Sequence, residues 1–332
     1  AAVQLKAADD FLPQSKWIGS EHCQSTPNTW LCFRKTVHLP GVLGEMIANI
    51  AVDSKYWLWI NGKMVVFEGG LKRGPAPGAT YYDQVDIAPY LEKGENTIAL
   101  LVWHFGKNGF SHVNSGTAAL LFCAQGANLS IVSDKSWQCS VYRAYQNTEA
   151  PFPNYRLSES NIRFDARKEL AGWNMPDFSG KLGASIEIVA PNEMPFGKLV
   201  ARPIPMWKNG GLTDYPEVVK NEKGDTIRCR LPYNCQITPY LHVKAPAGLV
   251  VGMLTDNYTG GSANNVRAEY ITREGEQEYE SFGWMNGHEV LYVVPAGVEV
   301  LGVKYRETGY NADMKGSFAC DDDFYNELWK RS

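Results

Sequence analysis

Apolar and polar positions alternate along much of the first part of the chain. Between residues 31 and 39 the apolar side chains fall on one face of an extended segment and most polar ones on the other. A period of two is the signature of a half-buried β-strand. Residues 47–52 are apolar on both faces, which predicts a central strand, and further strands are predicted at 56–60, 63–66, 85–91, 97–105, 118–123 and 129–132. Short strands at this spacing are typical of an antiparallel β-sandwich.

The strongest local signal is Asn61–Gly62, which separates the runs 56–60 and 63–66. Both central positions of a two-residue hairpin turn need positive φ, which Asn and Gly tolerate best. We therefore predict a hairpin here. Trp57 and Trp59 alternate onto one strand face, and we expect them to pack in the core.

A second β-rich block follows residue 184. Its predicted strands are 227–231, 236–243, 249–255, 266–272, 278–284, 290–294 and 298–305. Between the blocks, residues 143–183 contain three prolines and few alternating runs, which favours a linker with at most one short strand. The prediction is a mainly β chain with two antiparallel, jelly-roll-like β-sandwiches, divided as 1–142, 143–183 (linker), 184–312 and a last segment 313–332.

The last segment carries a helix signal. Asp321 is a candidate N-cap, and acidic residues here complement the helix dipole. Phe324 and Leu328 share a helix face at a spacing of four residues. This apolar stripe either docks on a sandwich or belongs to a domain that begins here, and we expect the second.

Composition excludes several classes of protein. With 332 residues, the chain has the length of about two ordinary domains of roughly 150 residues each. A net charge of −4 argues against a nucleic-acid-binding surface, so we expect no nucleic-acid partner. No apolar run reaches the roughly 18 residues of a membrane span, and the start of the chain lacks a signal-peptide pattern.

Cysteine and histidine spacing gives no metal-type motif. The seven cysteines are odd in number and scattered, so we expect buried structural thiols. Cys23 and Cys32, or Cys229 and Cys235, are close enough in sequence to close small loops. We predict neither a metal nor a cofactor.

One loop has the composition of a sugar-binding site. Sugar contact needs an aromatic face and planar polar groups, and residues 103–116 (WHFGKNGFSHVNSG) contain both. The alternative is a connection whose aromatic side chains plug one end of the sandwich. The candidate carbohydrate-binding residues are Trp103, His104, Asn108, His112 and Asn114. A second loop, 256–262, could contact a ligand or a cation, but a hydrogen-bonded turn is the simpler interpretation.

Several segments resemble a known family. Residues 56–63 (YWLWINGK), 82–87 (YDQVDI) and 94–97 (GENT) resemble the sugar-binding-like jelly roll shared by several glycosidase families. More specific are two later segments. Residues 134–137 (DKSW) with 164–173 (FDARKELAGW), and then 316–323 (GSFACDDD) leading into Leu328–Trp329, resemble the N-terminal, non-catalytic region of bacterial α-L-rhamnosidases of glycoside hydrolase family 78.

This resemblance implies a division of labour. The family cleaves terminal α-linked L-rhamnose by inversion, with two carboxyl groups roughly 6.5–9.5 Å apart, and these belong to an (α/α)6 barrel. By resemblance, 313–332 is the first helix of that barrel, so no catalytic residue is expected in this chain. The implied partners are that barrel and a rhamnose-containing oligo- or polysaccharide. The sequence departs from the family in 282–288 (FGWMNGH), where an aromatic-His-Gly-Phe-Arg-Tyr pattern is more usual.

Two further expectations accompany this interpretation. Family habit favours a periplasmic or secreted protein. The competing hypothesis is a free-standing, lectin-like carbohydrate-binding protein without hydrolytic activity, and a purely structural spacer in another glycosidase is a third.

Overall fold

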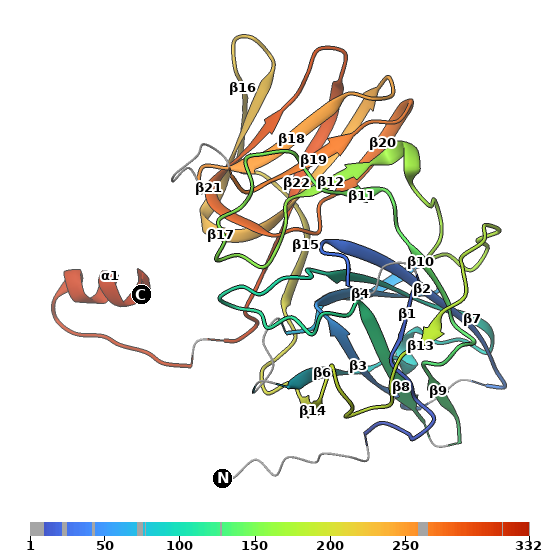
Figure 1. Ribbon diagram of the computed structural model, residues 1–332. Coiled ribbons are helices and arrows are strands. Elements are labelled where there is room, and N and C mark those ends of the chain that lie inside the picture. Colours follow the sequence, from blue (N-terminus) through green and yellow to red (C-terminus); the bar gives the residue numbers. More distant parts are fainter. Residues whose placement is uncertain are drawn as a thin grey trace.

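The computed structural model describes residues 10–21, 25–41, 44–71, 76, 78–126, 128–257, 265–313 and 315–331 (Figure 1). Its strands form three sheets, and the described residues include one α-helix. No helix among these residues is both long enough and apolar enough to cross a membrane.

The first sandwich consists of two sheets. The outer sheet contains β1 (Ile18–Gly19), β3 (Ile47–Asp53), β6 (Ala79–Asp86), β8 (Ala119–Gln125), β9 (Ser130–Val132), β13 (Ile186–Glu187) and β14 (Lys198–Ala201). The central sheet runs in the order β10 (Gln138–Val141), β2 (Thr29–Leu39), β7 (Gly94–His104), β4 (Lys55–Ile60) and β5 (Lys63–Gly69). Phe33 and Leu100 of the central sheet pack with Ile50 and Phe122 of the outer sheet in one apolar core.

The predicted hairpin is confirmed. β4 pairs antiparallel with β5, and the turn residues Asn61 and Gly62 have φ of 50° and 78°. The Asn61 side chain also receives a hydrogen bond from the backbone N of Thr97 at 2.9 Å, which ties the turn to β7.

The strand predicted at 85–91 is wrong in its second half. β6 ends at Asp86, and the 3-10 helix η1 (Ala88–Tyr90) follows. The Asp86 carboxylate accepts a hydrogen bond from the Ala88 backbone at 3.0 Å, which favours a turn. Pro89 has no backbone N–H to donate to a neighbouring strand.

The second sandwich is formed by one sheet that bends, which we call the bent sheet. Its strands are β11 (Tyr145–Gln146), β12 (Ile162–Asp165), β15 (Lys208–Asp214), β16 (Glu217–Lys220), β17 (Thr226–Ala245), β18 (Val250–Thr255), β19 (Arg267–Ile271), β20 (Gly275–Glu280), β21 (Met285–Val293) and β22 (Glu299–Gly309). The runs predicted at 227–231 and 236–243 are therefore parts of one long strand.

β17 connects the two layers of this sandwich. Its first part pairs with β16 and β21, and its last part pairs with β20 and β22. The register with β21 shifts between Arg230 and Cys235, where the strand changes layer. The Tyr292 hydroxyl of β21 lies 3.0 Å from the carbonyl oxygen of Tyr240 and 3.1 Å from that of Lys304, so the layers pack directly on each other.

The chain crosses between the sandwiches more often than the predicted division implies. β11 and β12 lie within the segment predicted as a linker, yet β12 pairs in parallel with β19 of the bent sheet. β13 and β14 follow residue 184 but pair with β1 and β6 of the first sandwich. These pairings place residues 186–201 with the first sandwich rather than the second.

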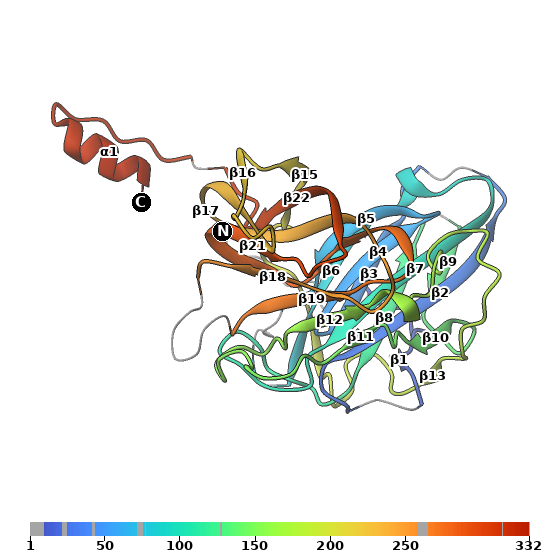
Figure 2. The same cartoon turned by 90° about the horizontal axis from the view of Figure 1, so that it is seen from above.

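The central sheet is buried on both faces. Leu100 and Val102 of β7 point into the core shared with the outer sheet, whereas Leu101 and Trp103 join a core shared with the bent sheet. The indole of Trp57 stacks on Phe282 with ring centroids 4.7 Å apart. Trp57 and Trp59 are both buried, so their predicted core role is confirmed. Figure 2 shows the two sandwiches in contact along this side.

The helix α1 (Asp323–Arg331) stands away from both sandwiches in Figures 1 and 2. The residue that caps it is Asp322 rather than the predicted Asp321, because the Asp322 carboxylate accepts a hydrogen bond from the Phe324 backbone at 2.9 Å. None of its residues is buried. Phe324 and Leu328 are 67% and 51% exposed, so the predicted apolar stripe is uncovered here.

None of the six described cysteines is part of a disulfide. Five are buried, and Cys320 is exposed. Burial raises the pKa of the Cys32 thiol to about 12, as expected for an inert structural cysteine. Cys229 and Cys235 do not bond to each other, and Cys23 lies outside the described residues.

Candidate functional site

The loop 103–116 begins at the end of β7, and its first two residues are buried. Trp103 is 1% exposed and His104 is 0% exposed. The indole N–H of Trp103 donates to the side-chain oxygen of Asn28 at 2.8 Å. Both residues face inward because the central sheet is covered on both sides.

Two histidines of this loop converge on one buried carboxylate. His104 Nδ1 and His112 Nε2 lie 3.3 and 3.4 Å from Oδ1 of Asp53. The Ser115 backbone donates to the second oxygen of Asp53 at 2.7 Å. Burial alone would raise the pKa of Asp53, but the hydrogen bonds from His104 and His112 outweigh it and hold that pKa well below its usual range.

A serine completes this cluster without forming a nucleophilic site. The Ser54 hydroxyl donates to Asp53 at 2.5 Å and lies 3.3 Å from Nε2 of His112. It also accepts a hydrogen bond from the Phe105 backbone at 3.1 Å, and Ser54 is 2% exposed. Because the hydroxyl proton points to the carboxylate and the group is enclosed, the cluster fixes the loop to β3 and β4 rather than exposing a nucleophile.

The two asparagines of the predicted set lie closer to solvent. Asn108 is exposed, and its side chain accepts a hydrogen bond from the Asn114 backbone at 2.8 Å. Asn114 is half-buried and accepts from the Gly116 backbone at 3.0 Å. The structure therefore divides the five predicted residues: Trp103, His104 and His112 are buried, and the two asparagines shape the outer turn.

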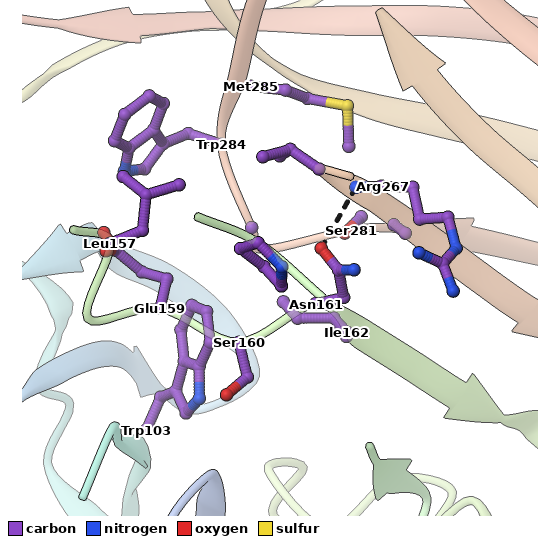
Figure 3. Close-up of a pocket in the computed structure, with 14 residues that line it drawn as sticks. Trp103, Leu157, Glu159, Ser160, Asn161, Ile162, Arg267, Ser281, Trp284 and Met285 are labelled. Atoms are coloured by element: carbon purple, nitrogen blue, oxygen red, sulfur yellow. Dashed lines mark hydrogen bonds between the residues drawn. The ribbon is translucent and has the colours of Figure 1, made fainter. Parts of the chain in front are cut away.

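One of the five predicted residues lines a cavity between the two sandwiches. Trp103 lines it from the first sandwich, and Trp284 and Met285 line it from the second (Figure 3). Asn161 fixes the wall between them, because its side chain accepts from the Arg267 backbone at 3.1 Å and donates to the Asn265 carbonyl at 3.1 Å. The cavity volume is about 40 Å³, which suits a few water molecules rather than a pyranose ring.

A buried ion pair lies beside this cavity and was not predicted. Lys55 Nζ is 2.5 Å from the Glu68 carboxylate and 4.0 Å from that of Glu159, which lines the cavity. Lys55 and Glu68 are 1% and 2% exposed. Burial lowers the pKa of Lys55, and the charge of Glu68 opposes that shift. The register of β4 with β5 shifts between Tyr56 and Leu58 and again between Leu58 and Trp59, so counting residues back from the turn does not give this pair.

Other neighbouring carboxylates have structural partners. Asp83 accepts from the Gly70 backbone at 2.7 Å and pairs with Arg202 at 3.2 Å. Both oxygens of Glu280 contact the guanidinium of Arg306, at 2.7 and 2.9 Å. Bidentate contacts of this kind neutralise the carboxylate and hold it in place.

Metal-ligating side chains do not gather within the described part of the chain. No group of three or more His, Cys, Asp or Glu residues there could hold a metal ion. Most of the loop 256–262 lies outside the described residues, and Asp256 accepts from the backbone of His288 at 2.8 Å.

Comparison with solved structures decides what this architecture is. A rhamnosidase of family GH78 from Bacillus sp. GL1 superposes with a TM-score of 0.82 at 16% identity over 95% of this chain. The fold is that of part of an α-L-rhamnosidase. The enzymes from Aspergillus terreus and Dictyoglumus thermophilum agree, with TM-scores of 0.70 and 0.68 at 20% and 19% identity over 95% and 96% of the chain.

The rhamnosidase fold extends well beyond what this chain spans. The chain covers 57% of the Bacillus structure and 38% of each of the other two. No protein-family model and no curated protein matches the sequence. The likeness confirms the predicted β-sandwich architecture at sequence identities of 16–20%.

Proposed function

We propose that this chain is the accessory β-sandwich region of an α-L-rhamnosidase-like glycoside hydrolase. In this proposal a helical domain of the same protein hydrolyses terminal α-L-rhamnose from an oligo- or polysaccharide, and the two sandwiches support that domain. The observation that carries the proposal is the superposition of 95% of the chain on only 57% of a GH78 rhamnosidase, with a TM-score of 0.82.

The carboxylates of the described residues support a non-catalytic role. An inverting glycosidase needs two carboxyl groups roughly 6.5–9.5 Å apart across a space that admits a sugar and a water. Glu68 and Glu159 flank Lys55 in a buried cluster, and the adjoining cavity has a volume of about 40 Å³. That space is too small for a sugar.

The exposed face of α1 supports the second half of the proposal. Phe324, Tyr325, Leu328 and Trp329 are 40–67% exposed on one short helix. Apolar side chains gathered in this way usually mark an interface. In the proposed enzyme this face packs against the following helices of the catalytic domain.

The deciding experiment compares the natural gene product with this 332-residue chain. Its intact mass is measured, and both are assayed for hydrolysis of p-nitrophenyl α-L-rhamnoside. We expect a substantially longer product that cleaves the substrate and an inert 332-residue chain. A natural product that ends at Ser332 and only binds sugar would overturn the proposal in favour of a free-standing carbohydrate-binding protein. Export to the periplasm or the medium is part of the proposal, and cell fractionation tests it.

A further inference from the structure

A second hollow lies at the outer edge of the interface cavity. It has a volume of about 90 Å³ and shares Ser160 and Asn161 with the cavity of Figure 3. One wall comes from the loop 103–116 through Lys107, and the other comes from the segment 147–161. The proposed support of a catalytic domain gives no role to the described residues that line this hollow.

Two polar side chains of the hollow have unused bonding capacity. Thr148 is 6% exposed, and its hydroxyl has no hydrogen-bond partner among the described residues. A buried hydroxyl without a partner is costly, which makes it a place where a ligand group gains a bond. Lys107 is half-buried and forms no ion pair with any described residue, and desolvation lowers its pKa.

The rim of the hollow is aromatic. Phe152 is 64% exposed and lines the same space. An exposed ring beside a polar hollow suits the C–H face of a sugar. Asn147 and Ser160 also line the hollow. The Asn147 side-chain oxygen accepts from the Asn28 side chain at 2.7 Å, so its amide N–H groups and the Ser160 hydroxyl are the groups that can bond to sugar hydroxyls.

We propose that this hollow binds a sugar that carries a carboxylate, a uronic acid residue. The Lys107 ammonium meets the sugar carboxylate, the Thr148 hydroxyl bonds to the sugar at the base of the hollow, and Phe152 covers one face of the ring. Glu159, which precedes the lining Ser160 in the chain, is 13% exposed and lies 4.0 Å from the Lys55 ammonium, which offsets part of its charge. The proposal is independent of the hydrolytic role, since it concerns binding by this chain alone.

An acidic sugar fits these residues better than a neutral one. A desolvated ammonium without a counter-ion gains most from an anion, because charge-assisted hydrogen bonds are stronger than neutral ones. A volume of about 90 Å³ admits the carboxyl end of a pyranose in place of several waters. The rest of the ring then lies against Phe152.

Titration calorimetry on the 332-residue chain tests the proposal with three probes. These are methyl β-D-glucuronide, methyl β-D-glucoside and acetate. We expect the glucuronide to bind at least about tenfold more tightly than either of the others. Equal binding of the glucoside and the glucuronide, or no binding of the glucuronide at millimolar concentration, would overturn the proposal.

Matched variants test whether glucuronide binds at this hollow. Lys107→Met should lower glucuronide affinity about tenfold or more, as expected for a lost charge-assisted bond of roughly 1.5–3 kcal/mol, whereas exposed Lys93→Met should not. Phe152→Ala should weaken binding, and exposed Tyr310→Ala should not. Thr148→Val should weaken binding without lowering the melting temperature, because the free protein gives this hydroxyl no partner. Equal effects of Lys107→Met and Lys93→Met would contradict the assignment.

Discussion

Two aromatic clusters of this molecule have similar side chains and opposite surroundings. Trp30, Trp57 and Trp103 lie between the sandwiches and are at most 1% exposed. Phe324 and Trp329 of α1 are 67% and 40% exposed. The first cluster has a partner within the described residues, the bent sheet, which covers it with Phe282. The second cluster extends from the body of the molecule without such cover.

The difference shows that residue type alone does not assign an apolar side chain to the interior. Burying an aromatic side chain stabilises the fold by several kcal/mol only where a second surface closes over it. The bent sheet supplies that surface to β2, β4 and β7, and the described residues supply none to α1. The comparison predicts that equivalent truncations in the two clusters have very different consequences.

The largest expected effect is that of Trp57→Ala. Its ring stacks on Phe282 at 4.7 Å and on Trp30 at 5.6 Å, and removing it leaves a large cavity between the sandwiches. We expect a loss of about 3–5 kcal/mol in the free energy of unfolding, measured by chemical denaturation. Trp57→Phe keeps a stacked ring and removes an indole N–H that has no partner, so it should cost much less. Similar losses for both variants would show that the stack contributes little.

The interface also contains charge, and Lys55→Met tests its contribution. The substitution leaves Glu68 buried without its ammonium partner, which should cost about 3–5 kcal/mol. The double variant Lys55→Met/Glu68→Gln removes both charges and should recover most of the loss. A double-mutant cycle monitored by urea denaturation measures the coupling. Strictly additive losses would mean that the two side chains do not stabilise each other.

The sequence predicted this interface only in part. Local patterns located most strands, and the Asn61–Gly62 turn located the hairpin that contains Lys55 and Glu68. His104 was predicted to contact sugar because the loop 103–116 contains aromatic and planar polar side chains. In the structure His104 lies on the face of β7 that turns to the outer sheet, where it contacts Asp53, and no local pattern carries this long-range contact.

The dependence on long-range contacts also explains why the candidate site and the division of the chain were predicted only in part. Asp53 lies far before His104 in the chain. Its contacts with the two histidines therefore depend on the pairing of strands that are distant in sequence. β13 and β14 are short, and their pairing with β1 and β6 depends on the tertiary fold. The end of the chain was easier to interpret, because helix caps and apolar spacing are local signals.

An intermediate effect is expected for Asp53→Asn, because the substitution weakens the contacts of the Asp53 carboxylate with His104, His112 and Ser54. Because the folded-state pKa of Asp53 lies below its unfolded value of about 3.9, the charged carboxylate stabilises the fold above that pH. This stability is lost as pH falls below about 4 toward the folded pKa. At neutral pH the variant should lose about 1–3 kcal/mol, measured by denaturation.

The pH series supplies the control for Asp53. The difference in unfolding free energy between the wild-type chain and Asp53→Asn should narrow as the pH falls below about 4, since the Asp53 carboxyl then binds a proton in the unfolded wild-type chain while it stays ionised in the folded one. An Asp134→Asn variant changes a carboxylate near the surface and should show a smaller difference throughout. If the difference in unfolding free energy between the wild-type chain and Asp53→Asn stays constant down to the lowest accessible pH, that result would argue against an ionised Asp53 carboxylate in the folded protein.

The smallest effect is expected at α1, where Trp329→Ala should change the unfolding free energy of this chain by less than about 0.5 kcal/mol. Trp329 is 40% exposed, and its ring lies 5.8 Å from Phe318 of the same terminal segment. In the longer enzyme proposed above, the same substitution should cost about 3–5 kcal/mol, because there the ring would be enclosed by a neighbouring helix. Denaturation of both proteins with and without the substitution separates these outcomes. A loss above about 1 kcal/mol in the 332-residue chain would show that α1 packs on the sandwiches in solution, and the contrast between the two aromatic clusters would then fail.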